Sequence, residues 1–134
     1  MSNVYVVYWS GTGNTQEMAM AIADGAKENG AEVTVWNVDE ADIEELKKAK
    51  ALALGCPSMG AEQLEEASME PFMCDLDSQI NGKTIALFGS YGWGDGQWMK
   101  DWEDRIASDG ATVLNGEGII ANNEPSQELS LIHI

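Results

Sequence analysis

Short apolar runs alternate with helical patterns along the whole chain, and this order constrains the fold more than any other feature. Residues 4–9, 51–56 and 84–88 are nearly all apolar, as expected for strands that are covered on both faces. Residues 33–36 alternate between apolar and polar, which is typical of an edge strand. Strands that alternate with helices form a parallel sheet with helices on both faces. The pattern therefore predicts a doubly wound α/β fold.

The helical segments between these runs each carry an apolar stripe. In the first, Met18, Ile22 and Ala26 recur every fourth residue, and a second stripe of this kind runs through residues 98–106. Shorter helices are predicted near residues 43–46 and 70–76. Residues 112–114 and 118–121 indicate a broken last strand. At 134 residues, the chain 1–134 is expected to form one domain.

The charge balance is strongly acidic, with 23 Asp and Glu against 7 Lys and Arg and a formal net charge of -16. Such a surface repels nucleic acid and anionic membranes and attracts basic partners. The first apolar run is too short to cross a bilayer, and no basic stretch precedes it. We therefore expect a soluble, cytoplasmic protein without a nucleic-acid or membrane partner.

Cysteine and histidine usage argues against a metal site. Cys56 and Cys74 have no metal-binding spacing and no disulfide framework around them, so both are expected to be free thiols that pack in the interior. The one histidine, His133, lies beside the C-terminus and is expected to have no function. No metal is predicted.

Residues 10–15, with the sequence SGTGNT, join the first apolar run to the first helix. Free backbone N–H groups and the positive end of the helix dipole favour an anion at such a place. The segment contains no Lys or Arg and fails both the P-loop pattern and the three-glycine dinucleotide pattern. It fits a monophosphate held by neutral donors, and the alternative is a glycine-rich turn without a ligand.

Two further loops follow buried strands, at residues 57–62 and 90–95. The carboxyl ends of parallel strands share one edge of the sheet, and ligands bind there where the strand order reverses. All three loops are therefore expected to meet at one site.

The three loops together resemble those of the flavodoxins. SGTGNT looks like their FMN phosphate loop, CPSMGAE at 56–62 resembles their loop after the third strand, and ALFGSYGWGDG at 86–96 resembles their fourth strand and its loop. The resemblance is to the short-chain bacterial type and covers residues 4–125. It implies a five-stranded sheet of order 2-1-3-4-5 and FMN as the cofactor.

By this resemblance the residues that bind FMN are Trp9, Ser10, Gly11, Thr12, Gly13, Asn14, Thr15, Pro57, Ser58, Met59, Gly60, Ala61, Glu62, Ser90, Tyr91, Gly92, Trp93, Gly94 and Asp95. Trp93 and Met59 are expected to cover the two faces of the flavin ring, since an aromatic ring favours offset stacking. Glu62 is expected to accept a hydrogen bond from flavin N3–H. The Gly60 carbonyl is expected to turn towards flavin N5 when one electron has entered.

The resemblance implies a low-potential one-electron carrier between redox enzymes, without catalytic residues of its own. Its acidic surface is expected to dock basic redox partners. One alternative is an FMN-dependent quinone reductase or nitroreductase, because a shared fold does not decide function. A phospho-accepting receiver domain is disfavoured, because Trp9-Ser10 and Gly55-Cys56 stand where that class needs acidic residues.

Two departures from the family affect the expectations. Ala61 stands where relatives often have Asp, Asn, Ser or Gly, which is expected to strain a turn that needs positive φ. The family continues into a long C-terminal helix, whereas residues 126–134 form only a short atypical tail. The missing helix is expected to bare apolar surface on the strands at 4–9 and 51–56. The family is monomeric, but such a face would permit a dimer.

Overall fold

The sheet and its helices follow the predicted order. The computed structural model describes residues 3–9, 14–28, 30–49, 51–57, 64–65, 67–91, 96–114 and 118–122, with the backbone alone at 3, 14, 90, 91 and 119–122. The strands are β1 (Asn3–Tyr8), β2 (Glu32–Asn37), β3 (Ala51–Gly55), β4 (Thr84–Tyr91), β5 (Thr112–Val113) and β6 (Ile119–Asn122). The helices are α1 (Asn14–Glu28), α2 (Ile43–Leu46), α3 (Met69–Leu76) and α4 (Gln97–Ser108), with short 3-10 turns η1 (Val38–Glu40) and η2 (Asp77–Gln79).

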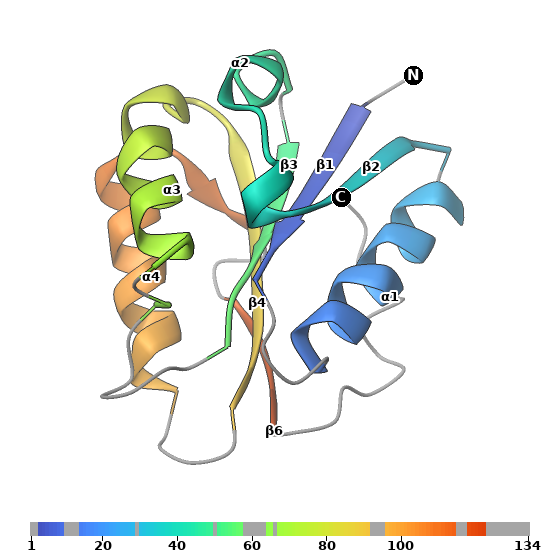
Figure 1. Ribbon diagram of the computed structural model, residues 1–134. Helices are drawn as coiled ribbons and strands as arrows, with labels where there is room; N and C mark the ends of the chain where they lie inside the picture. The colour runs from blue at the N-terminus through green and yellow to red at the C-terminus, as the bar shows by residue number, and fades with distance from the viewer. Residues whose placement is uncertain are drawn as a thin grey trace.

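All strand pairs are parallel, in the order β2-β1-β3-β4-β5 (Figure 1). This confirms the fold class and the edge position of β2. The last strand is broken as predicted: β5 pairs with the start of β4 at Thr84 and Ile85, and β6 pairs with its end at residues 88–91. The β4 strand extends to Tyr91, three residues beyond the predicted end.

Two apolar cores lie on the two faces of the sheet. Alternate residues of β1 supply them, with Val7 in the core on the α3 and α4 side and Val6 in the core on the α1 side. Figure 1 shows α1 on one face of the sheet and α3 and α4 on the other. The sheet is thus covered on both faces, which explains why its central strands are apolar runs without alternation.

The apolar surface that we expected to be bare is buried. On the α1 face, Val4, Val6, Ala53 and Phe88 are at most 1% exposed. The α1 helix contacts β1, β2, β3 and β4, and the Phe88 ring covers Gly55, where an added Cβ would overlap with the ring. The expected tail, residues 126–134, lies outside the described residues, as does His133.

The cysteine prediction is right about the free thiols and wrong about packing at one position. Both cysteines are free, and Cys56 is buried, but Cys74 is exposed. Cys74 lies on the outer side of α3, whose inner side is formed by Met69, Phe72, Met73 and Leu76. In the described part of the chain, no helix is long and apolar enough to cross a membrane, and no group of side chains could hold a metal ion.

Candidate cofactor site

The carboxyl ends of β1 and β3 lie side by side and their chains then separate. The Trp9 amide donates a hydrogen bond of 3.0 Å to the Gly55 carbonyl, directly after the two strands end. The chain after β1 enters α1 on one face, whereas the chain after β3 leads to α3 on the other (Figure 1). This is the point of the sheet where the direction of winding reverses, and such a point is where open α/β sheets bind ligands.

The first turn of α1 opens at this edge. The helix begins at Asn14, and the side chain of the next residue, Thr15, is buried at 1% exposure. A helix start presents backbone N–H groups and a positive dipole end, which favour an anion. Glu17, in the same turn, is exposed.

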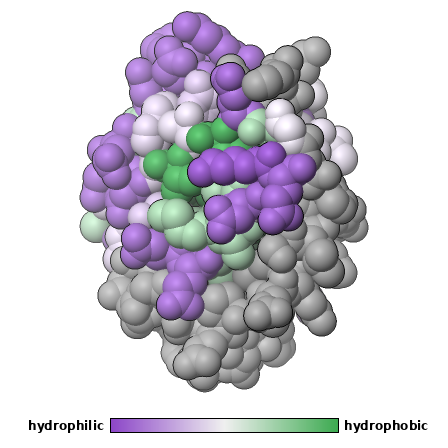
Figure 2. All heavy atoms as spheres, turned by 90° about the vertical axis from the view of Figure 1, so that its right-hand side faces the viewer, coloured by the Kyte–Doolittle hydropathy of each residue, from purple (hydrophilic) through white to green (hydrophobic). Residues whose placement is uncertain are grey.

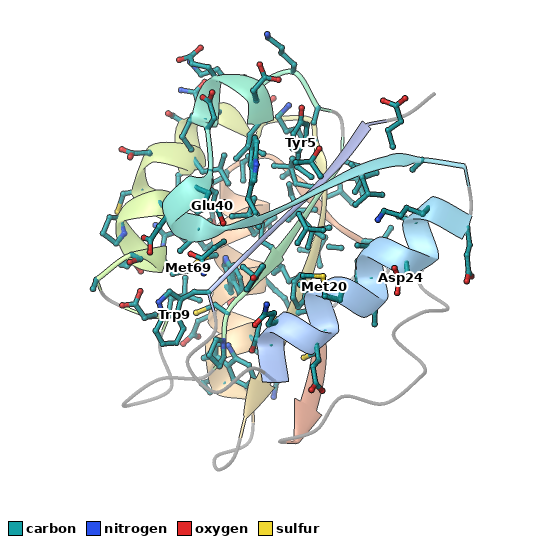
Figure 3. All side chains as sticks on the ribbon, turned by 45° about the vertical axis from the view of Figure 1, so that its right-hand side comes forward. Tyr5, Trp9, Met20, Asp24, Glu40 and Met69 are labelled. Carbon is teal, nitrogen blue, oxygen red and sulfur yellow. The ribbon has the colours of Figure 1, made fainter. Side chains whose placement is uncertain are left out.

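Trp9 supplies aromatic surface at the same edge. Its side chain is partly exposed and packs against the core on the α3 and α4 side, and Figure 3 shows it beyond the end of β1. Pro57 is partly buried at the end of β3, and the backbone of Ser90 and Tyr91 forms the end of β4, paired with Ala121 and Asn122.

The structure thus places the described members of the predicted site, Trp9, Asn14, Thr15, Pro57, Ser90 and Tyr91, at the ends of β1, β3 and β4 and the start of α1. The other predicted members lie outside the described residues: Ser10, Gly11, Thr12, Gly13, Ser58, Met59, Gly60, Ala61, Glu62, Gly92, Trp93, Gly94 and Asp95. The described strand and helix ends that flank the three predicted loops therefore share one edge of the sheet.

Glu65 is a buried carboxylate at this edge that the sequence analysis missed. It is 7% exposed, and its two oxygens accept hydrogen bonds from the amides of Ala67 at 2.6 Å, Ser68 at 2.7 Å and Met69 at 3.0 Å. Burial raises the pKa of Glu65, but these three N–H groups outweigh it and hold the pKa below its usual value. Its position four residues before an apolar helix was the signal available in the sequence, since a carboxylate satisfies the free N–H groups of a helix start.

Cys56 lies next to Glu65, and its thiol, amide and carbonyl groups all make hydrogen bonds. Its thiol accepts from the Glu65 amide at 3.4 Å, its amide donates to the Phe88 carbonyl at 3.1 Å, and its carbonyl accepts from Trp98 Nε1 at 3.1 Å. Burial raises the pKa of the thiol to about 12, so the thiol stays protonated and donates to the Pro57 carbonyl at 3.4 Å.

Positive charge is concentrated at the opposite edge of the sheet. Lys27 lies in the last turn of α1, Lys47 and Lys48 follow α2, and Lys83 precedes β4, so all four lie near the amino ends of the strands. Arg105 of α4 is paired with Glu70 and Asp77. Lys100, exposed in the first turn of α4 after the end of β4, is the exception. Among the described residues at the start of α1, an anion is met by neutral N–H and hydroxyl groups.

A hollow of about 530 Å³ lies on the outer side of α1. Its lining consists of Gln16, Glu17, Met20, Ala21 and Asp24. Figure 2 shows this side of the molecule, with a small apolar area among hydrophilic side chains, and Figure 3 shows Met20 and Asp24 on the helix. The lining contains no aromatic ring and no cation, so it does not suit a flavin or a phosphate.

The fold and the edge described above define a class: doubly wound parallel α/β proteins that bind a ligand at the switch point between β1 and β3, a class of which flavodoxins are a standard example. Comparison with known proteins narrows this class. The family model named Flavodoxin matches residues 6–133. The chain is 49% identical to a flavodoxin of Clostridium beijerinckii over 122 residues, which is 91% of this chain and 88% of the relative.

Two further comparisons also match flavodoxins. A flavodoxin of Megasphaera elsdenii is 45% identical over 111 residues, which is 83% of this chain and 81% of the relative. The solution structure of the two-electron reduced Megasphaera elsdenii flavodoxin superimposes with a TM-score of 0.88 at 42% identity and covers 96% of each chain. The chain belongs to the flavodoxin family. It is an FMN-binding carrier of electrons to and from redox partner proteins, not an enzyme.

The described residues fit FMN. The cofactor combines a phosphate dianion with a large aromatic ring, and this edge offers both a helix start with a buried threonine and a partly exposed tryptophan. When bound, FMN supplies the redox chemistry, taking up and releasing electrons, while the chain binds and orients it. The resemblance to short-chain flavodoxins and the choice of FMN are thus confirmed, and the reductase alternative is not favoured.

Proposed function

We propose that the chain, as a single domain, holds FMN with its three carboxyl-edge loops and passes electrons one at a time at low potential. The observation that carries this proposal is the meeting of β1 and β3 at the Trp9 to Gly55 hydrogen bond, with α1 starting at the same edge. The loops that continue from these strands must begin next to each other. Their sequences match the three flavodoxin loops, so one cofactor can touch all of them.

Within this site the phosphate is assigned to residues 10–15 and the ring to residues 57–62 and 90–95. Trp93 and Met59 cover the ring faces, and Glu62 accepts from flavin N3–H. Stacking of an aromatic ring on the flavin contributes about 0.5–1.5 kcal/mol beyond the area that it buries.

The low reduction potential of the bound flavin follows from the net negative charge of the protein. Full reduction adds negative charge to the flavin, and a chain with 23 acidic and 7 basic residues disfavours that charge. Four of the described cations also lie at the far edge of the sheet. The fully reduced protein is therefore a strong reductant.

An anaerobic dithionite titration of the FMN-loaded protein, followed by visible absorbance, tests the one-electron role. We expect long-wavelength absorbance to rise and then disappear in two resolved steps. A single two-electron step together with rapid oxidation of NAD(P)H would instead support the quinone reductase or nitroreductase alternative.

The phosphate assignment is tested by Thr15→Val, which keeps the shape of the buried side chain but removes its hydroxyl. We expect the Kd for FMN to rise about 10-fold, as for the loss of one hydrogen bond to a charged group. Thr34→Val, at an exposed position of β2, is the matched control and should leave the Kd unchanged. Equal Kd values for both variants would contradict the assignment.

Basic redox partners are proposed to dock at the acidic carboxyl edge. Exposed Glu17, Asp39 and Glu40 come soon after the ends of β1 and β2. Opposite charges at such an edge accelerate encounter, and salt screens the effect. The same acidic surface argues against nucleic-acid and membrane partners.

The docking surface can be tested with two glutamates at opposite ends of α1. Glu17→Gln should slow electron transfer to cytochrome c, a basic one-electron acceptor, by about 2- to 5-fold at low salt. Glu28→Gln removes the same charge at the far end of the helix and should have little effect. Equal rates for the two variants at low salt would argue against docking at this edge.

We also propose that the protein is a cytoplasmic monomer. The apolar side chains on the α1 face that would have supported a dimer are buried, as Val6 and Phe88 show at 0% exposure. Light scattering coupled to size-exclusion chromatography should give the mass of one chain across a wide concentration range. A mass that rises towards twice this value would support the dimer instead.

A further inference from the structure

Cys56 and Glu65 lie on either side of the loop after β3 that is predicted to bind the flavin ring. The Glu65 amide donates to the Cys56 thiol at 3.4 Å, although nine positions separate the two residues. This hydrogen bond joins the two described residues that flank the predicted flavin loop, which includes Met59 and Glu62. In general, a bond between the two ends of a loop lowers the entropy cost of holding the loop around a ligand.

Each end of this closure is anchored to a different rigid element. On the Cys56 side, the amide is bonded to the Phe88 carbonyl of β4 and the carbonyl to Trp98 of α4. Gly89 permits this close approach, because a Cβ there would overlap with the Cys56 carbonyl oxygen.

On the Glu65 side, the carboxylate caps the start of α3 through the amides of Ala67, Ser68 and Met69. The N-cap residue of α3, Ser68, makes no side-chain cap hydrogen bond of its own. Glu65 therefore takes over the capping of α3, and the helix in turn holds Glu65 beside Cys56.

We propose that Cys56 and Glu65 are positioning residues that hold the loop after β3 ready for the flavin and so raise the affinity for FMN and influence its first reduction potential. This inference rests on the proposed assignment of residues 57–62 to the flavin ring. Neither residue touches the cofactor in the assignment. Their effect passes through the loop that they close.

The uncharged member of the pair gives the cleaner test, because its variants do not alter the local charge. Cys56→Ala removes the acceptor for the Glu65 amide, and we expect the Kd for FMN to rise about 5- to 20-fold. The first reduction potential should fall, since a loosened loop is less well placed to bond the reduced ring. Cys56→Ser supplies a hydroxyl that can accept and donate in the same place and should recover part of both changes.

The second member is tested by amide hydrogen exchange in the FMN-loaded full-length chain. Glu65→Gln replaces one carboxylate oxygen with an NH₂ group, which cannot accept a hydrogen bond. Depending on which oxygen is replaced, the acceptor is lost for the Ala67 amide or for the Ser68 and Met69 amides. We expect at least 10-fold faster exchange at one of these amides and a higher Kd for FMN. Asp75→Asn, an exposed position on α3, removes the same charge and should change neither.

Glu62→Gln separates failure of this inference from failure of the site assignment. If Cys56→Ala and Glu65→Gln leave both the Kd and the first potential at wild-type values, the inference is overturned, whatever Glu62→Gln does. In that case, a changed Kd or potential in Glu62→Gln shows that the loop belongs to the flavin site, and unchanged values show that the assignment of residues 57–62 has failed as well. Should Cys56→Ala fold poorly, Cys56→Ser and Glu65→Gln still decide the matter.

Discussion

Trp98 Nε1 donates a hydrogen bond of 3.1 Å to the Cys56 carbonyl, and the two residues are 42 positions apart in the chain. The bond ties α4 to the end of β3 and is buried, with Trp98 only 1% exposed. Trp102, one turn further along α4, is also buried, but its indole N–H has no hydrogen-bond partner among the described residues. A comparison of variants at these two positions therefore isolates the contribution of the Cys56 hydrogen bond to stability.

Trp98→Phe should therefore destabilise the protein more than Trp102→Phe. Both changes remove a similar volume from the core, but the first also leaves a buried carbonyl without its donor, a difference of about 1–2 kcal/mol. Urea unfolding followed by circular dichroism measures both free energies of unfolding. A loss of stability at least as large in Trp102→Phe would show that packing, and not the hydrogen bond, dominates.

Asp109 should make stability fall as the pH rises from about 4 to 6. Burial raises its pKa from 3.8 to about 6, with further contributions from a hydrogen bond to Asp77 and from the charge of that residue. A group with a raised pKa in the folded state contributes stability that is complete below the unfolded value and lost as the pH passes the folded value.

Asp109→Asn removes this titration. We expect the variant to gain stability relative to the wild type at pH 7, with the gain shrinking as the pH falls from about 6 to about 4. Thermal unfolding between pH 3.5 and 7.5 gives the comparison. Parallel curves for the two proteins over this range would be inconsistent with a raised pKa.

Arg105 joins α3 to α4 through two carboxylates. Its Nε and Nη2 reach the Asp77 carboxylate at 2.7 to 3.1 Å, and Nη1 lies 2.9 Å from both oxygens of Glu70. Lysine cannot reproduce this forked contact, so Arg105→Lys should cost about 1–3 kcal/mol of stability.

The control for Arg105 is Lys48→Met, which breaks an exposed pair with Glu45 at 3.5 Å. An exposed pair contributes at most about 1 kcal/mol, so this change should stay within about 0.5 kcal/mol of the wild type. Guanidinium chloride would screen both ion pairs, so urea is the appropriate denaturant. Similar values for the two variants would mean that the forked geometry adds nothing.

Ala61→Gly should raise the first reduction potential of bound FMN. If the turn at this position needs positive φ in the reduced protein, alanine costs about 1–2 kcal/mol relative to glycine. Glycine removes this cost from the reduced state only. Spectroelectrochemistry of the two proteins measures the difference, and an unchanged or lower potential in the variant would refute the idea.

The sequence was sufficient for the parts of this protein that depend on short stretches of chain. The apolar run at 4–9 and the stripe of Met18, Ile22 and Ala26 are local patterns, because period and burial are properties of a single strand or helix. The assignment of a phosphate to the loop at 10–15 rests on equally local grounds, since phosphate binding at a helix start needs only neighbouring residues, and it stays a prediction. The capping box of η1, formed by Asn37 and Glu40, was equally local but went unnoticed.

Only the tertiary structure decided the contacts between distant segments. The closure of Cys56 on Glu65, the bond from Trp98 and the pairing of Arg105 with Asp77 each depend on how separate elements pack, and no periodic pattern encodes them. The same holds for Cys74, which was expected inside but lies on the outer side of its helix, and for the buried α1 face. The sequence of a strand or helix indicates which of its faces is apolar, but the geometry of the whole sheet determines what covers that face.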